Sequence, residues 1–223
     1  MPWFNCEDIG GGSIDGPRYI TTIDGKIQNR DVKLKTDSYK WESVSTLPYG
    51  FAYGSVVVLN NEIHILGGRF DYKTNHYKYD GSTWTSVSTL PYGCNETAVI
   101  LYNNEIHMIG GYLGGQSHYK YDGSTWINVS SLPYEFKDGS AVIYNNEIHI
   151  LGGYSDTNLA SISIKHYKWN GSTWTNVSTL PYSFYDSSAV VYNNEIHILG
   201  GFIDSSNPGH TKHYKWTSLL YKY

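Results

Sequence analysis

Histidine and glutamate recur together in this chain, always in the same local sequence. The decapeptide YNNEIHILGG occupies residues 144–153 and again residues 192–201, and near-copies occupy residues 59–68 and 102–111. Imidazole and carboxylate groups bind zinc and can act as general acids or bases. The four copies could therefore form a metal site or an acid/base constellation, or they could be the constant part of a repeated structural unit. The residues concerned are Glu62, His64, Glu105, His107, Glu147, His149, Glu195 and His197.

Two independent markers show that the chain is a tandem repeat. Glycine pairs begin at positions 67, 110, 152 and 200, and the tryptophan of a W-x-x-V-S-x-L-P-Y segment stands at positions 41, 84, 126 and 174. Both markers advance by 43, 42 and 48 residues. A fixed period of this length is typical of propellers and other repeat architectures.

Each repeat predicts four short antiparallel strands. In one copy, residues 187–192 (SSAVVY) are apolar and β-branched, as buried strands are. Asn193 and Asn194 tolerate the left-handed backbone that a two-residue hairpin turn requires. Residues 195–199 follow, and then come a variable loop, an HYKY or HYKW strand, a D/N-G-S-T turn and, in most copies, a strand that begins at tryptophan. Four such strands with three hairpin connections make one blade of a β-propeller.

The spacing within the repeat resembles that of the kelch family. In kelch repeats a glycine pair precedes a tyrosine, and a tryptophan follows that tyrosine after six intervening residues. The resemblance covers about residues 50–216 and implies an all-β, kelch-type β-propeller, a fold that hosts many binding proteins and a few enzymes. The tyrosine and tryptophan pairs that match are Tyr77 and Trp84, Tyr119 and Trp126, and Tyr167 and Trp174.

The number of blades depends on the two ends of the chain. We expect residues 1–223 to form one propeller of five blades, the last of which lacks most of its fourth strand. Residues 19–27 (YITTIDGKI) resemble a strand, a turn and a strand, and residues 3–9 (WFNCEDI) resemble residues 126–132 (WINVSSL). The alternative is four blades preceded by an N-terminal attachment segment. The expected parts are a closing strand and hinge at 1–17, a degenerate blade at 18–49, and kelch blades at 50–92, 93–134, 135–182 and 183–223.

Packing is the role that we expect for the repeated histidines. Ligands must converge to within about 2.0–2.2 Å of one metal ion, whereas the second strands of different blades lie too far from the propeller axis. The resemblance to kelch repeats implies an aromatic residue at this position, packed between blades. We therefore expect no metal and no cofactor. The same interpretation applies to a second set of histidines on the third strand: His76, His118, His166 and His213.

Two enzyme types with related propellers provide remote alternatives. A copper radical oxidase needs a cysteine cross-linked to a tyrosine, and Cys94 stands in a loop, but no long appended domain is evident. The DGSTW turns resemble the sialidase Asp-box S-x-D-x-G-x-T-W, yet their spacing differs by one residue. A sialidase-type carboxylate clamp would need Arg18, Arg30 and Arg69 to converge, although they fall on only two predicted blades. We therefore predict a non-catalytic protein.

Composition narrows the range of partners. The formal net charge is −4, with 16 Lys and Arg against 20 Asp and Glu, and only three residues are arginine. A nucleic-acid-binding protein would normally carry a basic stripe, so no nucleic-acid partner is expected. The N-terminal sequence shows no signal peptide, and no run of 18 apolar residues predicts membrane insertion. We expect synthesis in the cytoplasm.

The variable loops are the better candidates for a binding site. The Asn-Asn and D/N-G-S-T turns are nearly constant, whereas the loops after the glycine pairs and between blades differ, and antiparallel topology puts both variable sets on one face. Aromatic side chains among Asp, Asn and Lys suit a sugar ring or a protein hot spot. The predicted ligand-binding residues are Arg69, Phe70, Tyr72, Tyr112, Phe136, Asp138, Tyr154, Asp156, Tyr185, Asp186, Phe202 and Asp204.

The amino-acid sequence of the repeat indicates a role in recognition. Nearly identical copies rich in Asn, Lys, Tyr and Ile resemble kelch arrays of low-GC Gram-positive bacteria and their phages. This resemblance implies a phage tail or virion-associated module that recognises a host-surface glycan or protein. A cytosolic adaptor for protein–protein interaction is the alternative. The sequence does not indicate the oligomeric state.

Overall fold

The structure is a computed structural model that describes residues 19–21, 27–29, 40–68, 73–154, 162–203, 209 and 211–218. The chain divides into two compact units, Met1–Val44 and Ser45–Tyr223. In the first unit, β1 (Tyr19–Thr21) pairs antiparallel with β2 (Ile27–Asn29). These two strands agree with the strand, turn and strand predicted there.

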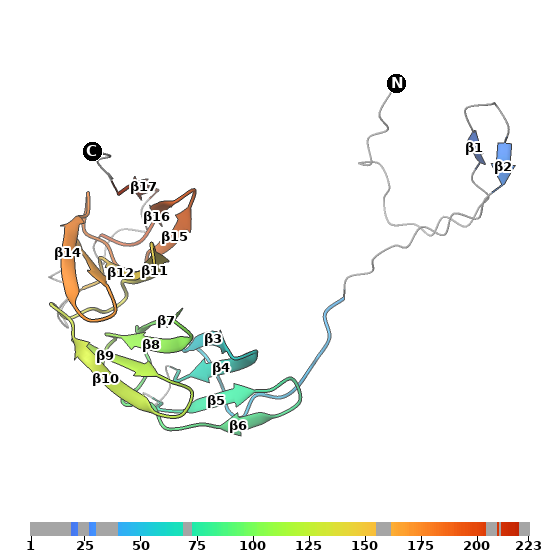
Figure 1. Cartoon of the computed structure of the whole chain (residues 1–223), viewed down its shortest axis with the longest axis horizontal. Coiled ribbons are helices and arrows are strands. Elements are labelled where there is room, and N and C mark those ends of the chain that lie inside the picture. The colour runs from blue at the N-terminus through green and yellow to red at the C-terminus, as the bar shows by residue number, and fades with distance from the viewer. Residues whose placement is uncertain are drawn as a thin grey trace. The chain divides into compact units, whose positions relative to one another are not determined.

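The second unit consists of four antiparallel sheets, each made of strands that are consecutive in the sequence (Figure 1). Blade 1 contains β3 (Ser55–Leu59), β4 (Glu62–Leu66), β5 (His76–Tyr79) and β6 (Trp84–Ser86). Blade 2 contains β7 (Ala98–Tyr102), β8 (Glu105–Ile109), β9 (Ser117–Tyr121) and β10 (Trp126–Ser131). Blade 3 contains β11 (Ser140–Tyr144), β12 (Glu147–Leu151), β13 (Lys165–Trp169) and β14 (Trp174–Thr179). Blade 4 contains β15 (Ser188–Tyr192), β16 (Glu195–Leu199) and β17 (His213–Trp216).

The turns at one end of the blades have the geometry that their residue types predict. In blade 3, Tyr144 pairs with Glu147, and between them Asn145 and Asn146 have φ angles of 49° and 58°. Two consecutive left-handed residues are what a tight hairpin needs, and asparagine tolerates that conformation. At the same end of blade 2, Asp122 Oδ1 accepts hydrogen bonds from two backbone N–H groups at 2.8 and 2.9 Å. Both constant turns are therefore structural.

Each core lies between two consecutive blades. Ile109 of blade 2 packs in one cluster with Ile148, Ile150 and Trp169 of blade 3. The clusters between blades 1 and 2 and between blades 3 and 4 are built in the same way. Complete burial of one such side chain contributes about 1.5–3 kcal/mol. Since both faces of a blade are apolar, each blade needs a neighbour on both sides.

The Leu-Pro-Tyr segment links blade 2 to blade 3 and blade 3 to blade 4. The Tyr134 hydroxyl, at the end of blade 2, donates a hydrogen bond to the carbonyl of Gly152 in blade 3 at 3.1 Å. Tyr182 makes the same bond to Gly200 in blade 4 at 3.1 Å. The preceding leucine is buried in each case, so the segment combines an apolar anchor with a polar one.

The architecture is an all-β propeller of four blades with three or four strands each, so the prediction of five blades is wrong and the four-blade alternative holds. Of the segment expected to form a degenerate blade, residues 18–49, the described part before Val44 contains only the two-stranded sheet of β1 and β2, in the first compact unit. Residues 1–18 lie outside the described residues, so the closing strand and hinge stay predictions. The described residues contain no helix, and therefore none that is long and apolar enough to cross a membrane.

We predict that Gly110→Ala destabilises the junction of blades 2 and 3. Gly110 has a φ of 63°, and an added Cβ would lie 2.0 Å from the carbonyl oxygen of Phe136. The backbone of Phe136 must then move, at a cost of at least about 2 kcal/mol. The matched control is Gly123→Ala, where φ is 101° but no atom lies within 4 Å of the new Cβ. Thermal unfolding of both variants is the measurement, and equal melting temperatures would contradict the account.

Candidate functional site

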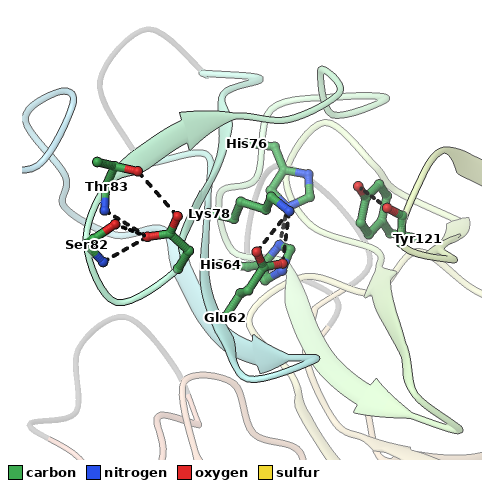
Figure 2. A network of polar contacts seen from close by, with 9 residues as sticks. Glu62, His64, His76, Lys78, Ser82, Thr83 and Tyr121 are labelled. Atoms are coloured by element: carbon green, nitrogen blue, oxygen red, sulfur yellow. Dashed lines mark hydrogen bonds and ion pairs between the residues drawn. The ribbon is translucent and has the colours of Figure 1, made fainter.

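The repeated histidines form one pair inside each blade. In blade 1, Nδ1 of His64 lies 2.8 Å from Nε2 of His76, and Figure 2 shows the two rings facing each other with Tyr121 of blade 2 beside them. The ring centroids of His76 and Tyr121 are 4.9 Å apart in an edge-on arrangement. The corresponding pairs in the other blades, each also at 2.8 Å, are His107 and His118, His149 and His166, and His197 and His213.

The repeated glutamates have partners of their own. Glu62 accepts a hydrogen bond from Lys78 Nζ at 3.0 Å, and Figure 2 shows this pair next to the two histidines. The lysine of every HYK strand makes the same contact with the glutamate of its own blade. Cross-strand pairs of opposite charge stabilise a sheet. Each repeated glutamate and histidine thus has its polar partner within its own blade.

Burial lowers the pKa of both histidines in the pairs of blades 1, 2 and 3. It lowers the pKa of His118 to about 3, with a further contribution from the nearby His107. Burial also lowers the pKa of His107 to about 4. The outer ring nitrogens, Nε2 of His107 and Nδ1 of His118, have no hydrogen-bond partner among the described residues. Within the same residues, no group of three or more His, Cys, Asp or Glu side chains is arranged to hold a metal ion.

A different set of residues converges at the end of the blades that lies opposite the Asn-Asn turns. These residues stand in the loops that precede the first strand of each blade. The first strands β3, β7, β11 and β15 contact one another in succession and line the axis. Just before each of them stands one non-glycine residue with φ between 48° and 58°. Left-handed non-glycine residues are uncommon and gather at functional sites. These residues are Tyr53, Glu96, Asp138 and Asp186.

Backbone hydrogen bonds join these loops to one another. The N–H of Asp186 donates to the carbonyl of Asp138 at 2.7 Å, and the N–H of Asp138 donates to the carbonyl of Glu96 at 3.2 Å. The chain of bonds runs from blade 4 to blade 2 around the axis. It holds three carboxylate-bearing residues close together on a rigid frame.

The four loops surround one cavity of about 270 Å³. All four blades contribute to its wall, which is polar and carries three carboxylates, two hydroxyl-bearing serines and a threonine. The lining residues are Tyr53, Gly54, Ser55, Asn95, Glu96, Thr97, Asp138, Gly139, Asp186 and Ser187. No lysine or arginine is among them.

The electrostatics of the cavity are those of crowded carboxylates. Burial, together with the negative charges of Glu96 and Asp186, raises the pKa of Asp138 to about 7. Glu96 also accepts a hydrogen bond from the hydroxyl of Tyr154. Burial and this bond raise the pKa of Tyr154. Near neutral pH, the carboxyl group of Asp138 is therefore only partly ionised.

The structure brings the two variable loop sets together, as predicted. Tyr154 forms an antiparallel bridge with Lys137, and Tyr185 forms one with Phe202. The rings of Tyr185 and Phe202 stack with centroids 5.5 Å apart. Lys137 is 4% exposed, is paired with Glu135 at 3.1 Å and lies 5.9 Å from the ring of Tyr112, which is itself exposed.

The predicted binding residues have different positions. Asp138 and Asp186 line the cavity. Tyr112, Tyr185 and Phe202 lie in the surrounding loops, and Tyr154 is 7% exposed with its hydroxyl on Glu96. The prediction that Phe136 contacts a ligand is wrong, because this residue is 0% exposed and packs on Tyr134 inside the core between blades 2 and 3. Arg69, Phe70, Tyr72, Asp156 and Asp204 lie outside the described residues.

Sequence reasoning missed several residues of the wall. Tyr53 and Glu96 occupy the same repeat position as Asp138 and Asp186, with the spacing of 43, 42 and 48 residues. The equivalence of the four positions could have been recognised from the repeat period, although the residue type differs between tyrosine, glutamate and aspartate. The hydroxyl groups of Ser55, Thr97 and Ser187 could not be recognised, because serine and threonine occur throughout the repeat.

Comparisons with known proteins support the fold. No protein-family model matches the chain, and no match was found among curated proteins. Among solved structures, the chain is similar to that of YjhT, with a TM-score of 0.62 and 14% sequence identity over 80% of this chain and 69% of that chain. At this identity the likeness shows the fold alone, a β-propeller.

The raised pKa of Asp138 predicts a pH-dependent gain from Asp138→Asn. Because the folded state holds this proton up to about pH 7 while an unfolded aspartate releases it near 4, Asp138 lowers stability progressively as the pH rises between these values. The variant should therefore raise the melting temperature at pH 8 and leave it nearly unchanged at pH 4. Asp122→Asn, in a turn at the other end, is the control and should show no such difference. A melting temperature that rises equally at both pH values would contradict the assignment.

The histidine pairs predict that His107 and His118 stay neutral in mildly acidic solution. Their lowered pKa values mean that the folded state binds fewer protons than the unfolded chain below about pH 6.5. Their contribution to stability is complete above that pH and falls as the pH decreases towards 3. Imidazole nitrogen chemical shifts should show no protonation of either ring at pH 5.5. A titration midpoint above 6 for both rings would show that the pair is not buried as described.

Proposed function

We propose that the chain is a non-catalytic recognition module of the kelch type, and that its ligand binds at the axial cavity and the loops around it. One observation carries this proposal. Four equivalent loops, one from each blade, hold a left-handed residue at the wall of a single polar cavity. Strained residues on a rigid frame are characteristic of binding sites.

The wall favours a ligand rich in hydroxyl or amino groups. Glu96, Asp138 and Asp186 offer carboxylate oxygens that accept hydrogen bonds, and the serine and threonine hydroxyls can both donate and accept. Tyr53, 66% exposed, and Tyr112, 39% exposed, provide aromatic rings in the loops at this end. We therefore propose a neutral or amino-bearing glycan, because an anionic sugar would meet the three carboxylates without a basic side chain among the lining residues.

The wider role that we propose is recognition of a host surface by a phage tail or another virion-associated protein. The nearly identical repeats, which resemble kelch arrays of low-GC Gram-positive bacteria and their phages, support it. The alternative is a cytosolic adaptor that binds a protein at the same loops. Retention of a single cytosolic protein by the immobilised chain, without glycan binding, would favour the adaptor.

A hydrolase that acts on the same glycans is the second candidate. The pKa of Asp138 near 7, beside two further carboxylates, suits a general acid. Mass spectrometry of bound glycans after prolonged incubation distinguishes the two functions. Intact glycans support the binding module. Cleavage that Asp138→Asn abolishes would establish the hydrolase.

We predict that glycan-array binding detects neutral or amino sugars and that Tyr53→Ala weakens this binding about tenfold or more. Loss of one aromatic contact at the centre of an interface commonly has an effect of this size. Tyr53 is exposed, so the melting temperature should change little. The matched control is Asn145→Gly, which preserves the left-handed turn at the other end and should bind normally. Normal binding by Tyr53→Ala together with lost binding by Asn145→Gly would contradict the proposal, because it would place the ligand at the end that carries the Asn-Asn turns.

A further inference from the structure

Blades 1 and 4 each have one face that no neighbouring blade covers. The contacts that link the first strands of neighbouring blades have no counterpart of similar extent between β15 and β3 in the described part of the chain. Figure 1 shows the four sheets following one another from β3 to β17 in sequence order. On the outer faces of blade 4 and blade 1, several large apolar side chains are exposed.

The exposed residues on blade 4 are buried at the equivalent positions of the other blades. Tyr192 is 62% exposed, whereas the equivalent Tyr102 and Tyr144 are 5% and 4% exposed. Leu199 is 41% exposed, and the equivalent Leu151 is 0% exposed. We call this surface, formed by Val190, Tyr192, Leu199 and His213, the blade 4 end face.

Blade 1 shows the same contrast on its opposite side. Ile63 is 39% exposed, while the equivalent Ile106, Ile148 and Ile196 are all fully buried. Val56 on the adjacent strand is 59% exposed. We call this surface, formed by Val56, Val58 and Ile63, the blade 1 end face. Contiguous apolar residues of this kind mark an interaction surface.

The two end faces are complementary, because the interior of the chain already joins such faces three times. Between blades 3 and 4, the ring of Trp216 packs on Tyr144, His149 and His166 at 5.6, 5.8 and 5.0 Å. Between blades 1 and 2, Tyr121 fills the position of Trp216 and packs on His76 at 4.9 Å.

The corresponding residues on the end faces are a tyrosine on one side and the same aromatic set on the other. Blade 1 has Tyr79, which is 8% exposed beside the exposed Val56, Val58 and Ile63, at the position of Tyr121. Blade 4 has Tyr192, His197 and His213 at the positions of Tyr144, His149 and His166. We propose that the chain associates head to tail with a second copy of itself, so that the blade 4 end face of one copy packs on the blade 1 end face of the next. The interface continues the blade-to-blade packing that holds each copy together, and it is heterologous.

The test uses two variants of the full chain, Tyr192→Asp on the blade 4 end face and Ile63→Asp on the blade 1 end face. Both side chains are exposed, so a charge there should leave the fold intact, which circular dichroism and melting temperature verify. By analytical ultracentrifugation, the unmodified chain should form dimers or larger species at micromolar concentrations, and each variant alone should be monomeric. Ile127→Asp, at a 42% exposed position on β10, is the control and should associate normally.

Mixing the two variants gives the decisive result. A mixture retains one intact pair of faces, so a heterologous interface restores a dimer and nothing larger. A monomeric unmodified chain would overturn the proposal, and so would a mixture that stays monomeric. Association lost in Tyr192→Asp but kept in Ile63→Asp would show a symmetric contact between blade 4 end faces and would also overturn it. Neither end face includes residues that line the cavity. The association test therefore does not depend on whether the chain or its variants bind a glycan.

Discussion

Packing between blades is the interaction on which the rest of the structure depends. A four-stranded sheet of about 20 residues with two apolar faces cannot bury both by itself, so each blade is stable only against its neighbours. The sequence meets this need by repeating the same apolar positions at a constant period. The histidine pairs of blades 1 to 3 belong to the same packing, since one histidine of each pair lies edge-on to an aromatic residue of the next blade, as His76 does to Tyr121. Residues that could do chemistry are thereby used for structure.

Because the packing between blades is the same at each junction, the loops at the cavity end can vary in sequence without loss of the fold. Turns made by Asn145 and Asn146 or by Asp122 are governed by backbone geometry and cannot vary freely. At the other end the first strands meet at the axis, and the residues that precede them face a shared cavity. Left-handed backbone at Glu96, Asp138 and Asp186 directs three carboxylates to one place. A scaffold with fixed blades and variable loops suits recognition better than it suits any single chemistry.

Much of the fold could be predicted from the sequence, because period, hairpin turns and alternation are local properties. The Asn-Asn turns and the antiparallel pairing of the HYK strand with the strand before it agree with the prediction. The number of blades could not be predicted reliably, since residues 19–27 resemble part of a blade locally, whereas among the described residues β1 and β2 pair only with each other. Of the residues that line the cavity, the sequence prediction included Asp138 and Asp186 but not Glu96. Phe136 was mistaken for a surface residue, because burial in a loop depends on distant contacts.

The central claim is that ligand contact occurs at the axial end where the variable loops meet. The most direct measurement is the mapping of backbone amide chemical-shift changes when a glycan identified by array binding is titrated into the labelled chain. The account predicts that the changes gather at residues 53–55, 95–97, 138–139 and 186–187. Changes concentrated at the Asn-Asn turns, or on the outer strands β6, β10 and β14, with none at these residues, would contradict it.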